Sequence, residues 1–322
     1  MEPVHNDIKK VVVIGGGTGS FVVLRGLKNY PFDISAVVTM FDSGGSSGVL
    51  RDEFGILPPG DARRCLIALS EGEKEETLRN LFNYRFNQEG SGLNGHNFGN
   101  ILLTALTRIM SNEAEAIEEA GKILNIKGRV LPVSLTVAHL CAELQNGEIV
   151  EGETNIDIPK HEGSLKIKRV FLKPEAFIYE ETAKAIQEAD MIIIGPGDLY
   201  TSVIPNFLVE GVSKAIQKSK AKKIYIMNLM TKWGETHGFK ASDFSSEIIK
   251  YLGIEKLDAI IVHDAVVSKE LAETYAEQKQ FPVVLDDTLK NYTARIITGD
   301  ICDESSLLRH DSEKLAALIS KV

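Results

Sequence analysis

The chain has 322 residues, 43% of them hydrophobic, with a formal net charge of −9 and a pI near 5.4. This length is enough for a large buried core, and the acidic balance argues against nonspecific attraction to nucleic acid or to an anionic membrane surface. Three cysteines without paired spacing exclude a disulfide framework and a cysteine-bound zinc site, and no apolar run reaches the roughly 20 residues of a membrane-spanning helix. The polar segment 1–10 lacks the apolar core of a signal peptide, so we expect a cytoplasmic protein.

The first predicted strand ends in a glycine-rich turn. Residues 11–14 form an apolar run typical of a buried parallel strand, and a helix is expected to begin near Phe21. The residues of the turn, which can bring backbone N–H groups close to a phosphate, are Gly15, Gly16, Gly17, Thr18 and Gly19. With Ser20 in the third place, the turn is a weak match to the dinucleotide-binding pattern G-x-G-x-x-G, and it does not match the phosphate loop of ATPases. A turn that serves only close packing of helix on strand is the alternative.

A second predicted strand, residues 34–40, leads into another loop with donor groups. Asp42 and Ser43 open this loop, and its further candidate donors are Gly44, Gly45, Ser46 and Ser47. Neutral backbone and hydroxyl donors suit phosphate, whereas a carboxylate beside phosphate requires a cation or a sugar hydroxyl between them. We therefore expect Asp42 to bind a metal ion or a ribose hydroxyl.

The sequence Pro-Pro-Gly-Asp, which ends at Asp61, precedes a predicted helix over residues 62–69. This position predicts that Asp61 is the N-cap of the helix, either for local reasons alone or with a ligand contact in addition. Three arginines lie close by in the sequence, Arg51, Arg63 and Arg64, and supply the positive charge that a phosphate ligand needs.

A Gly/Asn-rich loop ends at the start of an apolar helix predicted over residues 101–106. His96, Asn97 and Asn100 surround this helix N-terminus and are candidates for ligand contacts. Side chains in this position can bind a ligand or can satisfy the free N–H groups of the helix itself.

The middle of the chain, at about residues 129–172, is predicted to be a small antiparallel β-rich insertion. Asn146-Gly147 is the pair typical of a type I′ hairpin between two strands. Glu151 and Glu153 alternate with small residues in the second strand, so we expect both side chains to be exposed.

After the insertion, strands and helices alternate. Apolar strands are expected at residues 191–194, 223–227 and 259–262, and the first of them ends in a third glycine loop with Gly195 and Gly197. The helices between these strands are expected at residues 174–188, 205–218 and 242–252. This rhythm predicts a single α/β domain across the chain: a doubly wound, mostly parallel, Rossmann-like sheet that binds ligands at the carboxyl ends of its strands.

Together these motifs resemble the CofD/YvcK family of 2-phospho-L-lactate transferase-like proteins, which includes the bacterial gluconeogenesis factors. The resemblance rests on the glycine turn, the Asp42 loop, the Pro-Pro-Gly-Asp segment, and the Asn-Gly-His-Asn-Phe-Gly-Asn segment that ends at Asn100. Segment 195–202, Gly-Pro-Gly-Asp-Leu-Tyr-Thr-Ser, is similar to a further motif of the family and adds Tyr200 and Thr201 to the candidate ligand-binding residues. The match runs from about Lys10 to about Asp264.

The resemblance implies two different activities. In the transferase branch, the terminal hydroxyl of a deazaflavin attacks a guanosine-diphosphate-linked lactate and releases GMP, with magnesium. The YvcK-like branch, which the Ser-Ser-Gly segment at Ser46 fits better, is associated with UDP-sugar binding and with cell shape during growth on gluconeogenic carbon sources. This chain departs from the usual family pattern at Ser43, where a second Asp is common, and at Arg64, where Asn is common.

Three hypotheses follow from the sequence, which identifies no catalytic residue. The first is a regulatory protein that binds a nucleotide sugar, the second a 2-phospho-L-lactate transferase-like enzyme, and the third an NAD(P)-binding oxidoreductase. The oxidoreductase hypothesis does not explain the donor-rich loop after Asp42. The expected ligand is a UDP-sugar, with GDP or NAD as alternatives and Mg²⁺ at Asp42, while a monomer and a homo-oligomer both remain open.

Overall fold

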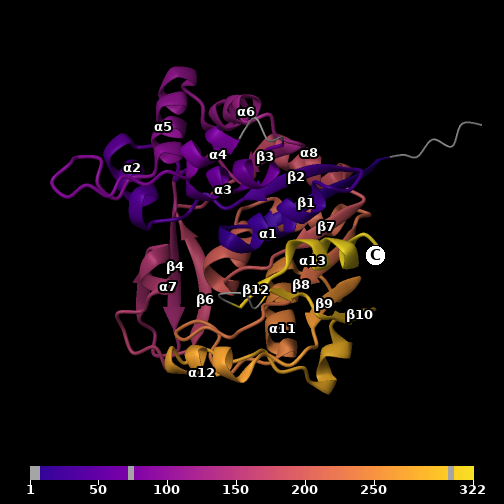
Figure 1. Ribbon diagram of the computed structural model, residues 1–322. Coiled ribbons are helices and arrows are strands. Elements are labelled where there is room, and N and C mark those ends of the chain that lie inside the picture. Colours follow the sequence, from indigo (N-terminus) through magenta and orange to yellow (C-terminus); the bar gives the residue numbers. More distant parts are fainter. Residues whose placement is uncertain (1–7, 72–75, 304–307) are drawn as a thin grey trace, which may run out of the picture.

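A seven-stranded parallel sheet forms the centre of the computed structural model, which describes residues 8–71, 76–303 and 308–322 (Figure 1). The strand order is β10-β9-β8-β7-β1-β2-β3, and every neighbouring pair is parallel. In chain order these strands are β1 (Lys9–Gly15), β2 (Phe32–Val38), β3 (Arg129–Pro132), β7 (Met191–Ile194), β8 (Lys222–Ile226), β9 (Ala259–His263) and β10 (Ile296–Gly299). The predicted doubly wound, mostly parallel α/β fold is confirmed.

The central strands are apolar along their whole length because helices cover them. Val11 and Ile14 in β1, and Ile192 and Ile194 in β7, have at most 1% of their surface exposed. Strands buried on both faces are typically continuous runs of Val and Ile. The helices before the insertion are α1 (Gly17–Leu27), α2 (Gly45–Phe54), α3 (Gly60–Leu69), α4 (Glu76–Asn83), α5 (Phe98–Met110) and α6 (Glu113–Ile123). Those after it are α8 (Glu180–Glu188), α9 (Ile204–Phe207), α10 (Val212–Lys218), α11 (Ala241–Leu252), α12 (Lys269–Glu277) and α13 (Ser312–Ile319).

The order of the strands creates a crevice beside β1. From β1 the chain proceeds to β2 and β3 in one direction along the sheet, whereas β7, on the other side of β1, leads to β8, β9 and β10 in the opposite direction. Right-handed crossovers that run in opposite directions place their helices on opposite faces of a sheet. The chain therefore continues from β1 and from β7 toward opposite faces of the sheet, and ligands of such sheets bind in the crevice at this point.

The insertion forms a separate three-stranded antiparallel sheet, β5-β4-β6, below β3 in Figure 1. It consists of β4 (His139–Leu144), β5 (Ile149–Glu151), the short helix α7 (Glu153–Asp157) and β6 (Ile167–Lys173). The predicted type I′ turn is wrong, because only Gly147 of the Asn146-Gly147 pair has a positive φ, of 88°. The Gly147 N–H donates to the Leu144 carbonyl, which is the pattern of a type I turn followed by a glycine bulge.

Several expected element boundaries differ from those observed. Helix α1 begins at Gly17 and not near Phe21, so the glycine turn is already its first turn. The expected helix at 174–188 begins only at Glu180. The expected helix at 205–218 is divided into α9 and α10 at Gly211, whose φ of 105° is not helical, and a π-turn (Leu199–Val203) precedes α9.

The C-terminal part adds a 3-10 turn (Asp287–Asn291) and a small hairpin of β11 (Cys302–Asp303) and β12 (Arg309–His310). Residues 1–7, which belong to the segment examined for a signal peptide, lie outside the described part of the chain. Within the described part, every helix is too short or too polar to cross a lipid bilayer.

Candidate functional site

Two glycine loops meet at the crevice beside β1. Glycine is required at Gly19 because a Cβ atom there would lie 2.0 Å from the carbonyl oxygen of Pro196. A Cβ atom on Gly16 would lie 2.6 Å from Oδ2 of Asp61. Gly17 has a left-handed backbone, with φ of +62°, which disfavours any other residue. Close packing of the two loops thus accounts for Gly19, the contact with Asp61 accounts for Gly16, and a sharp entry into α1 accounts for Gly17.

Asp61 belongs to this crevice and not to the end of its own helix. Helix α3 has Pro59 at its N-cap position, and Asp61 makes no capping bond, so the prediction of an N-cap role is wrong. Instead, its Oδ1 atom accepts a hydrogen bond of 2.8 Å from the Gly17 N–H, and it lies 3.7 Å from the Arg64 guanidinium. Burial, together with the charge of Asp42, raises the pKa of Asp61 to about 6.

The loop after β2 divides into residues that face the crevice and residues that do not. Asp42 lines the crevice, and its Oδ1 atom accepts a hydrogen bond of 2.8 Å from the Gly44 N–H. Helix α2 begins at Gly45, so Ser46 and Ser47 are buried in its first turn. The Ser46 hydroxyl lies within 3.3 Å of three groups of the neighbouring loop: His96 Nδ1, the Asn97 N–H and the Asn100 side-chain amide.

The polar residues around the start of α5 form an internal network. The Asn97 side chain caps α5 by accepting from the Gly99 N–H, and the Asn100 side chain accepts a bond of 2.9 Å from the Arg63 guanidinium. Arg63 also contacts Asn83 at 3.1 Å. Among the described residues, this network holds α2, α3 and α5 together behind the Asp42 loop, and none of these side chains lines the crevice.

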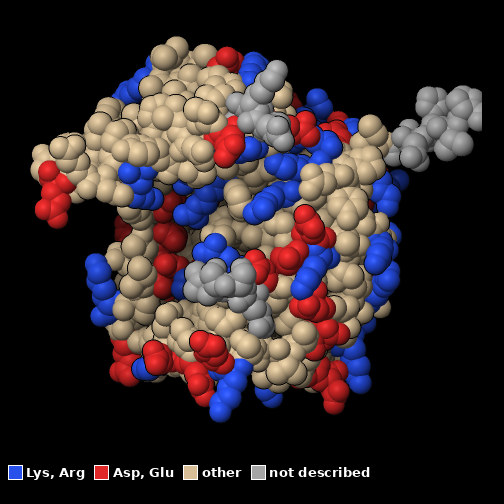
Figure 2. All heavy atoms as spheres, in the orientation of Figure 1, with Lys and Arg blue, Asp and Glu red and all other residues tan. Residues whose placement is uncertain are grey.

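A cleft of about 310 Å³ opens from the crevice, and Figure 2 shows a hollow on this face with Asp and Glu side chains deep inside it. Five carboxylates line it, from four different parts of the chain: Asp42, Asp61, Glu153, Asp157 and Asp198. Its other lining residues are Gly16, Gly17, Thr18, Gly19, Thr39, Arg64, Gly197, Thr201 and Ser202. We call this space the acidic cleft. Of the predicted ligand-binding residues, the structure brings the glycine turn, Asp42, Asp61, Gly197 and Thr201 together here.

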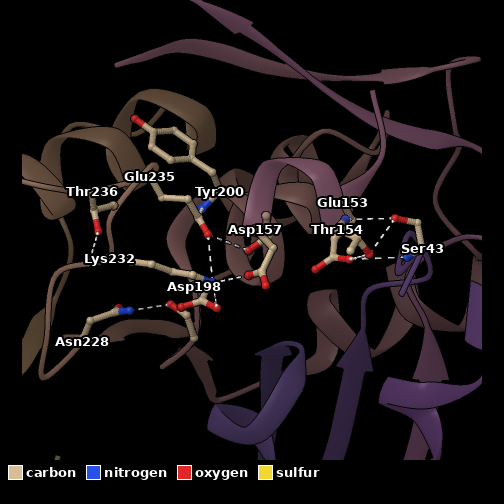
Figure 3. A network of polar contacts seen from close by, with 12 residues as sticks. Ser43, Glu153, Thr154, Asp157, Asp198, Tyr200, Asn228, Lys232, Glu235 and Thr236 are labelled. Carbon is tan, nitrogen blue, oxygen red and sulfur yellow. Dashed lines mark hydrogen bonds and ion pairs between the residues drawn. The ribbon is translucent and has the colours of Figure 1, made fainter. Parts of the chain in front are cut away.

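Three acids of the acidic cleft form the Asp42 cluster: Asp42, Asp61 and Glu153. Glu153 is the first residue of α7 and is partly buried, so the prediction that it is exposed is wrong. Its Oε2 atom lies 3.5 Å from the Ser43 N–H and accepts a bond from Thr154 (Figure 3). Burial, together with the charges of Asp42 and Asp157, raises the pKa of Glu153 to about 7. No local pattern identifies this residue, because the fold of the insertion brings it to Ser43.

Asp157 and Asp198, at the opposite end of the acidic cleft, form the Lys232 cluster together with Lys232 and Glu235, which lie behind them and do not line this cleft. The Lys232 ammonium donates to Asp157 and, at 2.8 Å, to Asp198, and it lies 3.3 Å from Glu235 (Figure 3). Glu235 is 2% exposed and also accepts bonds from the Tyr200 N–H and the Thr201 hydroxyl. Burial alone would lower the pKa of Lys232, but the three carboxylates raise it above its usual value. Burial raises the pKa of Glu235 to about 8.

The sequence points to this region through segment 195–202, which contains Asp198, Tyr200 and Thr201, whereas none of the motifs identifies Lys232 or Glu235. Trp233 lies beneath the Lys279 ammonium, 4.2 Å from its ring centre, and packs beside His237. It lines neither cleft of the crevice, which favours a packing role for this side chain. Tyr200 is likewise buried, and only its backbone N–H reaches the Lys232 cluster.

A second cleft, of about 330 Å³, lies on the other side of the glycine turn. It shares four residues with the acidic cleft: Thr18, Gly19, Gly197 and Asp198. Its further polar lining includes Asn228, Arg309 and His310, so the C-terminal segment, which the family motifs do not reach, forms one wall. The His310 Nε2 atom lies 3.1 Å from the Met227 carbonyl oxygen, and burial lowers the pKa of this imidazole to about 4. Lys232 lines this space as well, as an ion pair with Asp198, and we call the space the neutral cleft because these two charges oppose each other and His310 carries no charge near pH 7.

Comparison with known proteins gives a consistent result across nearly the whole chain. The family model described as 2-phospho-L-lactate transferase CofD matches residues 11–302. A protein named gluconeogenesis factor from Halalkalibacterium halodurans is 46% identical over 314 residues, which is 97% of this chain and 95% of that protein. The gluconeogenesis factor of Bacillus subtilis is 42% identical over 313 residues, with 96% of each chain covered. A crystal structure of a Bacillus halodurans protein superposes with a TM-score of 0.92 at 45% identity, covering 97% of this chain and 100% of that one.

Proposed function

The chain belongs to the 2-phospho-L-lactate transferase CofD family, and we propose that it is a gluconeogenesis factor of the YvcK type that binds a nucleotide sugar. The proposal of a nucleotide sugar as ligand rests on one observation: two clefts of similar size meet at the glycine turn that begins α1. A nucleotide sugar has a matching division, with a nucleoside and a sugar on the two sides of a diphosphate.

The diphosphate is assigned to the residues that the two clefts share. Thr18 and Gly19 lie in the first turn of α1, where backbone N–H groups have no partner within the helix. The Gly17 N–H already donates to Asp61. This N–H group is therefore not assigned to the diphosphate. The nucleoside is assigned to the neutral cleft and the sugar to the acidic cleft, whose carboxylates accept hydrogen bonds from sugar hydroxyls.

The cellular role that we propose for this binding is control of cell shape during growth on gluconeogenic carbon sources. In this account, occupation of the crevice reports the level of a nucleotide sugar to a partner of the protein. Binding is what the polar lining of the two clefts supports most directly, because its donors and carboxylates suit the recognition of phosphate and hydroxyl groups.

The second candidate function is a transferase activity that resembles 2-phospho-L-lactate transfer. The acidic cleft favours it, because Mg²⁺ prefers oxygen ligands and is commonly bound by one or two carboxylates together with substrate phosphates. Asp42 stands beside the shared phosphate position and would hold the ion, which neutralises the charge of a diphosphate. In such a reaction the chain itself would position both substrates, and the glycine turn would orient the diphosphate.

A panel of ligands tests both functions. Thermal unfolding is followed with UDP-sugars, GDP, GTP and NAD, each with Mg²⁺ and in EDTA. We expect a UDP-sugar to raise the melting temperature, since a ligand at 100 times its Kd adds about 2.7 kcal/mol of stability. Release of a nucleoside monophosphate in the presence of an acceptor alcohol would establish transfer. If no nucleotide changes the melting temperature, the proposed function is wrong.

A further inference from the structure

The two ends of the acidic cleft differ in how their negative charge is balanced. In the Lys232 cluster, one buried ammonium contacts three carboxylates. In the Asp42 cluster, the ion pair that the described residues provide is Arg64 with Asp61, at 3.7 Å, and the Arg64 side chain is 45% exposed. Asp42 and Glu153 thus face the cleft without a cation of their own, beside the position assigned to the diphosphate.

We propose that Glu153, supplied by the β-rich insertion, joins Asp42 as the second carboxylate ligand of a divalent cation. It replaces the acid that this chain lacks at Ser43. This proposal rests on the proposed function, because the cation would lie beside the phosphate groups of the nucleotide.

The backbone of the Asp42 loop places the two carboxylates next to each other. Consecutive N–H groups point to them: that of Gly44 to Asp42 at 2.8 Å, and that of Ser43 to Glu153 at 3.5 Å. The longer contact is weak, and both it and the bond from Thr154 use Oε2, so that among the described residues Oε1 of Glu153 remains free to bind an ion. Two acids held by adjacent amides form one site even though they are far apart in the sequence.

Ser43 has a definite role in this arrangement. Its hydroxyl accepts a bond of 2.9 Å from the Thr154 N–H and lies 3.1 Å from the Thr154 hydroxyl. These contacts dock the start of α7 onto the Asp42 loop, as the right side of Figure 3 shows. Ser43 therefore supplies no carboxylate itself, but its hydroxyl holds the segment that contains Glu153.

Thr39 provides an independent sign of a missing ligand. It lines the acidic cleft and is 3% exposed, and its hydroxyl oxygen has no hydrogen-bond partner among the described residues. A buried hydroxyl without a partner costs free energy, which a bound ion or its ordered water would remove. The donor set of carboxylates and a hydroxyl consists only of oxygen, as Mg²⁺ and Mn²⁺ prefer.

The test uses Mn²⁺ alone, whose binding to the full chain is followed by electron paramagnetic resonance. Glu153→Gln keeps the shape of the side chain and removes its charge, and we expect Mn²⁺ affinity to fall at least tenfold. The matched control is Glu151→Gln, an exposed glutamate two residues earlier in the same segment, which should leave the affinity unchanged. Equal Mn²⁺ affinity in wild type and Glu153→Gln would overturn the proposal.

A second variant separates a ligand from a residue that only shapes the loop. Adding Ser43→Asp to Glu153→Gln supplies a carboxylate at the neighbouring position and should restore Mn²⁺ affinity to within about threefold of wild type. A folded double variant without this recovery would show that Glu153 acts through loop structure, and would also overturn the proposal. UDP-sugar binding in EDTA, measured on the same proteins, tests the proposed function separately.

Discussion

The Asp42 cluster and the Lys232 cluster contain three carboxylates each, yet they differ in the cation that balances their negative charge. The Lys232 cluster carries its own counterion, and each of its acids contacts the same ammonium. Among the residues that the structure describes, the cation of the Asp42 cluster is a partly exposed arginine at 3.7 Å. A buried ammonium in direct contact with all three acids contributes to the fold, whereas acids beside a partly exposed arginine are suited to bind a cation together with a ligand.

Removing the ammonium of Lys232, the counterion inside the Lys232 cluster, tests this comparison most strongly. Lys232→Met leaves three carboxylates without a cation, two of them partly and one fully buried. Removing one partner of a buried ion pair costs about 3–5 kcal/mol, and we expect a loss of that size in chemical denaturation. Lys250→Met is the control, because Lys250 pairs with Glu247 at the surface and such pairs are worth about 0–1 kcal/mol. Similar losses in the two variants would contradict a structural role for the Lys232 cluster.

The next effect concerns ligand binding and not stability. Asp42→Asn keeps the shape of the side chain at the Asp42 cluster but removes its charge. We expect UDP-sugar affinity in Mg²⁺ to fall by about 1.5–3 kcal/mol, with loss of the difference between Mg²⁺ and EDTA. Asp33→Asn, an exposed position at the other end of the same strand, serves as the control in calorimetry. If Asp42→Asn retains its response to Mg²⁺, the residue accepts a ribose hydroxyl or only orders its loop.

A pH-dependent effect distinguishes the neutral cleft from the acidic one. Burial lowers the pKa of His310 from 6.5 to about 4, so the folded protein holds it neutral while the unfolded chain takes up a proton below pH 6.5. His310 therefore contributes stability above pH 6.5, and this contribution is lost as the pH falls toward 4. The slope is at most about 1.4 kcal/mol per pH unit for one proton. His310→Gln should have a flatter stability profile between pH 6.5 and 4, and an unchanged slope would contradict this assignment.

The fold was predictable because its signals are local. Apolar strands such as residues 11–14 and 191–194 are bounded by glycine loops, and their alternation with helices indicates a parallel sheet. The glycine turn and segment 195–202, which belong to the family motifs, also lie together at the carboxyl edge of that sheet. The hairpin turn was predicted with the wrong type because Asn146 tolerates both signs of φ, and the local sequence does not decide between them.

The site was only partly predictable because its important contacts join distant residues. Asp61 has the sequence of a helix cap, but its partner is the Gly17 N–H, 44 residues away. Glu153 has the pattern of an exposed strand residue, and its neighbour Ser43 lies 110 residues earlier. The same limit explains Ser46, whose hydroxyl was expected to face a phosphate and instead contacts Asn100 and its neighbours.

The most direct test of the account is a calorimetric titration of the wild-type protein with a UDP-sugar, in Mg²⁺ and in EDTA. The two clefts at the glycine turn predict one binding site for each chain, and the uncompensated Asp42 cluster predicts that Mg²⁺ tightens binding at least tenfold. No binding under either condition would contradict the assignment of a nucleotide sugar to the crevice. Equal affinity in Mg²⁺ and EDTA would show that the Asp42 cluster binds its ligand without a cation.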